Sequence, residues 1–98
     1  MAYIIKQPYW KVIREVQSIE QKKTTETRYI YLYEDKITTK YHEFPMEKML
    51  DVSFKKMQSG GGLLFLHTDH GVYSYHVPAS PSKFIEASQA CIERYQLE

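Results

Sequence analysis

The side chains that could carry out chemistry in this chain of 98 residues are a single cysteine and four histidines. Cys91 lies on the apolar stripe of a predicted C-terminal helix, where a thiol is buried and inert, so it is no candidate nucleophile. His67 and His70 flank a predicted turn instead of sharing a helix face, so we do not expect their imidazoles to converge on a metal. The sequence has no G-x-S-x-G motif, phosphate-binding loop or paired-carboxylate signature. We therefore predict no enzymatic activity, no catalytic residue, no metal and no cofactor.

The charge balance and the composition exclude further classes of protein. The 13 Lys and Arg residues against 12 Asp and Glu residues give a net charge of +1, which excludes a protein that coats a polyanion, and we expect no nucleic-acid partner. With 43% hydrophobic and 14% aromatic residues, a disordered chain is not expected. No apolar run approaches the ~18 residues of a membrane span, and the N-terminal residues do not form a signal peptide. We expect a single domain, residues 1–98, located in the cytoplasm.

Alternation of apolar and polar residues predicts a chain that is mainly β and ends in one helix. The strongest strand is 28–33, in which Ile30 and Leu32 point one way and three tyrosines point the other way. A tight turn at residues 34–35 then leads into a return strand, which makes a hairpin. Residues 9–20 also show some helical spacing, and we favour a strand there because the next segments need pairing partners. The predicted strands are 9–20, 28–33, 36–42, 50–55, 63–68 and 72–77.

The segments between the strands carry their own signals. They are a polar connection at 21–25, one helical turn at 45–49 that begins with a proline, and a flexible glycine loop at 59–62. In strand 50–55 we expect Leu50 and Val52 to share a face. The C-terminal helix is expected to have Ser80 as its N-cap and Pro81 at its first helical position. It should run for about fourteen residues, with an apolar stripe made by Phe84, Ser88, Cys91 and Tyr95.

Six strands in meander order cannot bury both of their faces as one flat sheet. They are expected to fold over into a sandwich or an open barrel, because an open sheet of this kind leaves its edges unpaired. The C-terminal helix would then close the open end.

Several stretches of the chain resemble a known family. They are 28–37 (RYIYLYEDKI), 44–53 (FPMEKMLDVS), the late strands 62–68 and 71–77, and the start of the helix at 81–87 (PSKFIEA). Together they are similar to pleckstrin-homology-like (PH-like) domains of the small, stand-alone bacterial type. The resemblance implies an all-β fold with one C-terminal helix, namely a PH-like β-sandwich or open barrel of six to seven antiparallel strands capped by an α-helix. Because the family has seven strands, the seventh is expected either from a break within 9–20 or from residues 3–5 as an edge strand.

The resemblance also implies a place for an anionic ligand. Family members that bind phosphoinositides carry Lys and Arg on the first two strands and on the loop between them, and the residues here that match are Lys22, Lys23 and Arg28. Glu26 stands where the family pattern has a basic residue, and its carboxylate opposes an anionic headgroup. Weak, salt-sensitive binding to anionic lipid is therefore the alternative function.

The tyrosines are the leading candidate for an interaction face. Tyr29, Tyr31 and Tyr33 share one face of their strand, and Tyr41 is expected to join them through strand pairing, as could Tyr73 or Tyr75. Outward-facing tyrosines form the kind of amphipathic surface that is enriched at interfaces, whereas ordinary cross-strand packing is the other interpretation. We predict a small intracellular protein-binding or scaffolding module whose partner is another protein or a second copy, as in a homodimer.

Overall fold

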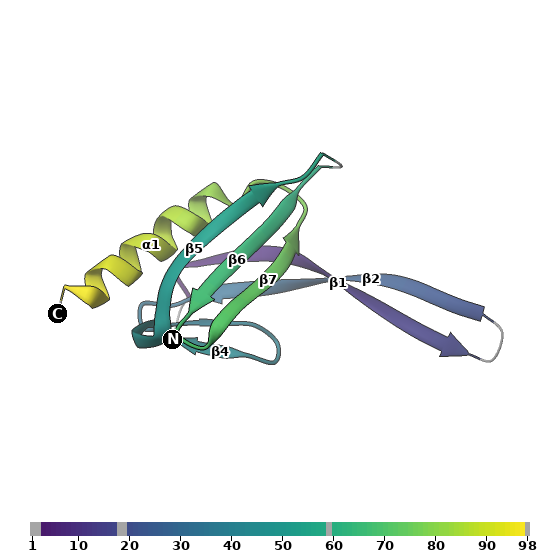
Figure 1. The fold of residues 1–98 in the computed structure, drawn as a ribbon, viewed down its shortest axis with the longest axis horizontal. Coiled ribbons are helices and arrows are strands. Elements are labelled where there is room, and N and C mark those ends of the chain that lie inside the picture. The colour runs from purple at the N-terminus through teal and green to yellow at the C-terminus, as the bar shows by residue number, and fades with distance from the viewer. Residues whose placement is uncertain (1–2, 18–19, 59, 98) are drawn as a thin grey trace.

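The structure is a computed structural model that describes residues 3–17, 20–58 and 60–97, and along 12–17 and 20–24 it describes the backbone alone. The described chain is mostly β with one C-terminal helix, as predicted (Figure 1). Its elements are β1 (Ile5–Gln17), β2 (Glu20–Leu32), β3 (Lys36–Thr38), β4 (Glu43–Pro45), the 3₁₀ helix η1 (Met46–Lys48), β5 (Met49–Lys56), β6 (Gly62–Thr68), β7 (Gly71–Val77) and α1 (Ser82–Gln96).

The strands of the described residues form one seven-stranded antiparallel sheet in the order β4-β3-β2-β1-β7-β6-β5. Each half of the sheet is a meander, and the first and last strands join the two halves through the pair Trp10 and His76. The sheet is open, since β4 and β5 are its two edges. Figure 1 shows α1 running beside β5, on the side of the sheet away from the β1–β2 hairpin.

The core lies between the curved sheet and α1. Burial alternates strictly along β6, and on β2 the buried side chains are Ile30 and Leu32. Phe84 of α1 is fully buried, so the helix contributes to the same core. One cluster contains all the buried hydrophobic residues, namely Tyr9, Ile30, Leu32, Ile37, Phe44, Met46, Met49, Val52, Leu64, Leu66, Val77, Phe84, Cys91 and Ile92.

The first two strands are longer than predicted. Strand β1 begins at Ile5, and the polar residues 21–25, which we expected to form a connection, lie within β2. The β1–β2 ladder continues from the pair Ile5 and Leu32 out to the pair Gln17 and Glu20. Threonines suit a pleated strand, and the ladder satisfies the backbone of a polar segment as well as that of an apolar one. The prediction of a loop at 21–25 was therefore wrong.

The seventh strand lies just beyond the predicted strand 36–42. Residues 36–42 divide into β3 and a turn, in which the Thr39 N–H donates to the His42 carbonyl (2.8 Å) and the His42 N–H donates to Thr39 Oγ1 (3.1 Å). Strand β4 follows that turn and is the strand that the sequence count lacked. Neither expected source of it was right, since β1 is unbroken over its described length and the Ile4 N–H donates to the Leu32 carbonyl (2.7 Å) as an extension of the β1–β2 ladder.

A bulge at the start of β5 corrects a second prediction. The register shifts between Met49 and Asp51, so Met49 enters the core beside Val52 while Leu50 is 57% exposed. An extra residue on one strand changes which side chains face the core, because side chains alternate with a period of two. The helical turn expected after Phe44 is present as η1.

The start and the last turn of α1 also differ from expectation. Pro81, not Ser80, is the N-cap residue, and its carbonyl accepts the Ile85 N–H at 2.9 Å. Phe84 lies on the buried stripe as predicted, whereas Tyr95 is 41% exposed. The stripe therefore ends before the last turn of the helix, where the sheet no longer covers it.

The glycine loop contains positions where a side chain would collide with backbone, and Gly61 is one of them. Gly61 has φ +62°, and a Cβ there would lie 2.1 Å from the Val77 carbonyl oxygen. Gly60 also has positive φ, but a Cβ there meets open space. A substitution at Gly60 therefore measures the destabilisation caused by an unfavourable φ alone, whereas one at Gly61 adds the destabilisation caused by a steric clash with backbone.

We expect Gly61→Ala to destabilise the domain more than Gly60→Ala, because both substitutions strain the backbone but only the first also collides with β7. Urea unfolding of the two variants checks this. Equal losses of stability would contradict the close contact with Val77.

Replacing Phe84 with Ala should lower the free energy of unfolding by about 3–5 kcal/mol, since the ring is fully buried between α1 and the sheet. Phe84→Leu removes less volume and should give a smaller loss, which remains measurable if the alanine variant does not fold. Leu97→Ala, at an 82% exposed position, is the control and should change little. Urea unfolding monitored by circular dichroism measures all three variants.

Candidate functional site

Three tyrosines, two on β2 and one directly after it, lie on the side of the sheet opposite the core. Tyr29, Tyr31 and Tyr33 alternate with Ile30 and Leu32, which are fully buried. Tyr29 is 38% exposed, and the other two rings are half-buried. A strand that places one set of side chains in the core must present the next set to the other side of the sheet.

Lysines lie among these rings. Lys6, on β1, is the cross-strand partner of Tyr31, and its Nζ is 4.8 Å from the centre of the Tyr29 ring. Lys36 Nζ is 5.4 Å from the centre of the Tyr33 ring. Cations over aromatic faces at these distances are attracted by the ring quadrupole. We use the term tyrosine face for Tyr3, Tyr29, Tyr31 and Tyr33 together with Lys6, Lys36 and Lys40.

The tyrosine face is packed at one end and hollowed at the other. Tyr3 meets Tyr31 edge to face, with ring centres 5.1 Å apart, and this contact extends the face beyond β2. A shallow groove of about 430 Å³ lies over Tyr29, Tyr31 and Tyr33 and is also lined by Arg28, Thr38, Thr39 and Lys40. Tyr3 and Lys6 were missed by sequence reasoning, because the predicted first strand began only at residue 9.

Tyr41, Tyr73 and Tyr75 do not join the tyrosine face. Tyr41 lies in the β3–β4 turn and is 72% exposed, because strand pairing of β3 ends at Thr38. Tyr75 packs edge to face on the buried Tyr9 ring (5.0 Å between centres), and Tyr73 packs against Phe44 (4.9 Å). The expected extension of the ladder to these residues was therefore wrong.

A separate cleft lies beside these inward-facing aromatic rings. Its volume is about 540 Å³, and its walls come mainly from β1, β2, the β3–β4 turn and β7. The walls include the side chains of Tyr9, Lys11, Arg28, Thr39, Tyr41 and Tyr75. We call this space the Arg28 cleft, because Arg28 provides its most buried cationic side chain.

The Arg28 guanidinium is held by one carboxylate and one ring. Its Nη2 donates to Glu26 Oε2 at 3.2 Å, and its central carbon lies 5.3 Å from the centre of the Tyr41 ring. The side chain is 12% exposed. Burial by itself lowers the pKa of Arg28, but the hydrogen bond and charge of Glu26 outweigh it, so the pKa is raised and the group stays charged.

One donor of Arg28 is left over. Its Nε atom is buried and has no hydrogen-bond partner among the residues that the structure describes. The signal for this inward position was in the sequence, since Arg28 precedes Ile30 and Leu32 at the same two-residue spacing.

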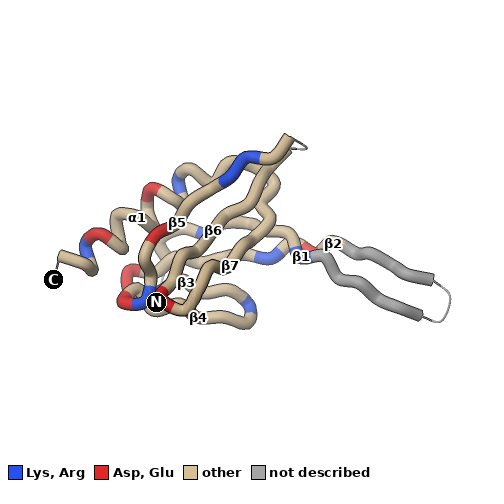
Figure 2. The backbone as a smooth tube through the Cα atoms, viewed as in Figure 1, with Lys and Arg blue, Asp and Glu red and all other residues tan. Residues whose placement is uncertain are grey.

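Lys22 and Lys23 do not form a loop site with Arg28. Both lie within β2, where their cross-strand partners are Glu15 and Arg14, and their side chains are outside the described residues. Five residues of extended strand separate Lys23 from Arg28, which corresponds to about 17 Å. The connection expected at 21–25 is therefore a strand, while contact of Lys22, Lys23 and Arg28 with an anionic ligand stays a prediction. Figure 2 shows basic and acidic positions interspersed over the described backbone.

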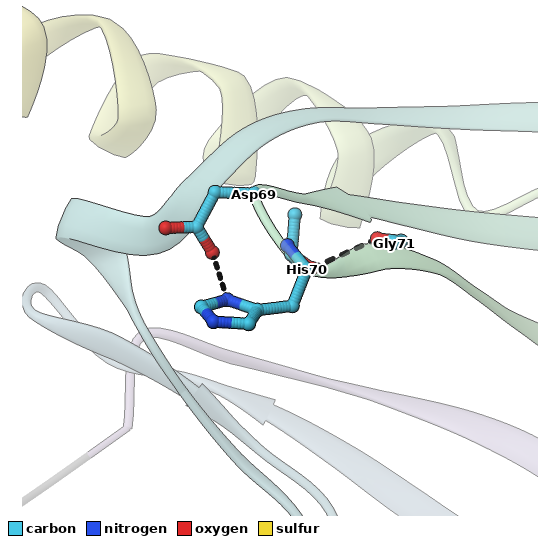
Figure 3. A network of polar contacts seen from close by, with 4 residues as sticks. Asp69, His70 and Gly71 are labelled. Carbon is cyan, nitrogen blue, oxygen red and sulfur yellow. Dashed lines mark hydrogen bonds and ion pairs between the residues drawn. The ribbon is translucent and has the colours of Figure 1, made fainter.

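The histidines and the cysteine take local roles. His67 Nε2 is 2.7 Å from Ser53 Oγ on the next strand. In the β6–β7 turn, His70 Nδ1 contacts Asp69 Oδ1, and Thr68 Oγ1 donates to the Gly71 carbonyl (Figure 3). Within the described residues, no group of three or more His, Cys, Asp or Glu side chains is placed to hold a metal ion. The Cys91 thiol is buried, and burial raises its pKa.

Tyr75 keeps its proton far into the alkaline range. Burial, opposed in part by the hydrogen bond with Thr39, raises the pKa of its phenol to about 12. At neutral pH the cleft therefore contains a neutral hydroxyl group that can both donate and accept a hydrogen bond.

Comparison with protein-family models and with curated protein sequences finds no match to this chain. No helix in the described part of the chain has the length and apolar character needed to cross a membrane. The arrangement of the side chains therefore carries the functional argument.

Stability should fall as the pH rises from about 10 to about 12, because the unfolded chain releases the Tyr75 proton near its ordinary pKa of 10.0 while the folded chain retains it. The contribution is fully present below pH ~10. Urea unfolding at pH 9, 10 and 11 measures the slope, and Tyr75→Phe should make the slope shallower. An unchanged slope in Tyr75→Phe would show that other groups cause the alkaline loss.

Proposed function

We propose that this chain is a small binding module of the PH-like type, without catalysis, that docks a protein partner on its tyrosine face. The order of the seven strands, the pairing of β1 with β7 and the C-terminal helix support a PH-like architecture. The single free thiol, Cys91, supports a reducing, cytoplasmic setting.

The observation that carries this proposal is an exposed aromatic surface on a sheet whose other side is already occupied by the core. Tyr3 and Tyr29 are 43% and 38% exposed, and Ile4 beside them is 49% exposed. Tyrosines supply large contact areas with a polar end, and they are enriched among the residues that dominate interface energies. The alternation of side chains along β2 puts Tyr29 and Tyr31 on the outer side, but core packing does not require aromatic residues there, whereas a docking surface uses them.

Charge selects the kind of partner. Lys6 and Lys40 border the rings, and Lys36 shares its charge with Glu43 through an exposed contact of 3.4 Å. Because the face carries more basic than acidic groups, its complement is an acidic protein surface. A lipid surface is less favoured, since Arg28 is already paired with Glu26 and is remote along β2 from Lys22 and Lys23.

The test is a ¹H–¹⁵N NMR titration of the full chain with a synthetic acidic peptide composed of glutamate and tyrosine. We expect shifts at the amides of Lys6, Tyr29 and Tyr31. Lys6→Gln/Lys40→Gln should weaken binding by ~3–10-fold, because rim charges each contribute modestly, and Tyr31→Ser should weaken it by ~10-fold or more.

The matched control is Lys55→Gln/Lys56→Gln, which removes the same charge from the exposed end of β5 and should alter affinity less than ~2-fold. If both double variants weakened peptide binding equally, the binding would depend on net charge alone, and the proposal would be overturned. A dimer detected by sedimentation and lost in Tyr31→Ser would assign the face to a second copy instead. Binding to phosphatidylserine vesicles that is lost in Lys22→Glu/Lys23→Glu would replace the proposal with lipid binding.

A further inference from the structure

The Arg28 cleft contains a hydrogen-bond donor that the chain itself does not satisfy. Arg28 Nε is buried and unpartnered among the described residues, while Nη2 is engaged by Glu26 at 3.2 Å. Buried donors in folded proteins nearly always have an acceptor, and one without a protein acceptor requires water or a ligand. The free N–H belongs to a guanidinium that remains charged, so the strongest acceptor for it is an anionic oxygen.

The surroundings of this donor suit a small molecule. The cleft volume of about 540 Å³ lies within the range of small-molecule pockets. Its walls include the rings of Tyr9, Tyr41 and Tyr75, with Tyr41 placed over the guanidinium itself. Aromatic walls beside a single oriented cation favour a ligand with a planar or apolar body and a negative charge at one end.

The charge of the cleft limits the charge of its ligand. Arg28 is partly neutralised by Glu26, and the other Lys or Arg in the lining is Lys11, which is exposed. A polyphosphate needs several cations around it, whereas one incompletely neutralised guanidinium matches a single negative charge.

We propose that the Arg28 cleft binds a small monoanion, a carboxylate attached to a planar aromatic or apolar body, with the Arg28 guanidinium donating to a carboxylate oxygen. Arg28 and Thr39 also line the groove over the tyrosine face, so the two sites adjoin, but this proposal does not depend on the function proposed for that face. The phenol of Tyr75 and the hydroxyl of Thr39, which hydrogen-bond to each other, lie in the same walls, and the O–H donor that this pair leaves free is available to the second carboxylate oxygen or to a polar group on the body.

The test uses benzoate as the probe and benzamide, which has the same shape without the charge, as its control. In a ¹H–¹⁵N NMR titration, benzoate should bind with a dissociation constant of ~1 mM, a typical strength for a fragment of this size. It should shift the Arg28 Nε–H resonance. Benzamide should bind at least ~10-fold more weakly, because a hydrogen bond to a charged group is lost.

Two variants are expected to change the affinity for benzoate in opposite directions. Arg28→Gln should weaken benzoate binding ~10-fold or more, while Glu26→Gln should tighten it ~3-fold or more, because the competing carboxylate is removed. Lys11→Gln removes the same charge as Arg28→Gln from an exposed position and should change affinity less than ~3-fold. If Arg28→Gln does not fold, the Glu26→Gln and benzamide comparisons still decide the result.

Three results would overturn the proposal. Equal affinities for benzoate and benzamide would show that the cleft recognises the apolar ring and not the negative charge. Binding that Glu26→Gln leaves unchanged, or that does not shift the Arg28 Nε–H resonance, would place the carboxylate elsewhere. Tighter binding of inorganic phosphate than of benzoate would replace the carboxylate with a phosphate, and vesicles of anionic lipid would then show whether that phosphate belongs to a lipid headgroup.

Discussion

The two-residue period of β2 is the constraint on which the other features depend. Ile30 and Leu32 are fully buried in the only core that the described chain forms. Because side chains alternate along a strand, this burial forces Tyr29 and Tyr31 to the opposite face and forces Arg28 to the inner side. A slip of one residue would place three phenols in the core and expose the aliphatic residues. The tyrosine face and the Arg28 cleft are thus two consequences of one register.

Their chemistry differs because their surroundings differ. On the outer side, Lys6 lies over the Tyr29 ring beside solvent, so charge and aromatic area are both available to a large partner. On the inner side, the Arg28 side chain is largely buried, paired with Glu26 and part of the wall of the cleft. Electrostatic interactions are stronger away from water, which makes the inner side suited to a small anion and the outer side to a broad, weaker contact.

The opposite half of the molecule limits where partners can bind. Helix α1 lies beside the edge strand β5, and Gln89 Nε2 donates to the Val52 carbonyl at 3.0 Å and to Asp51 Oδ1 at 3.4 Å. An edge strand with free backbone groups invites pairing with another chain. Here the side chain of Gln89 donates to one of those backbone carbonyls, and the bulge after Met49 makes the spacing of the other backbone groups of β5 irregular. These features oppose strand addition at β5, so the face of the sheet is the better surface for a partner.

Local alternation in the sequence was enough to predict the β class, the 28–33 strand, the late hairpin and the amphipathic helix, because each depends on residues that are near neighbours. The tyrosines of β2 were grouped correctly for the same reason. Tertiary structure alone decided that 36–42 would split into β3 and a turn, that Met49 would replace Leu50 in the core, and that β2 would extend through 21–25. It also decided that Tyr41 would leave the ladder and that Arg28 would lie in one cleft with Tyr9 and Tyr75. These outcomes depend on pairing register and on contacts between residues distant in sequence, which local propensity does not encode.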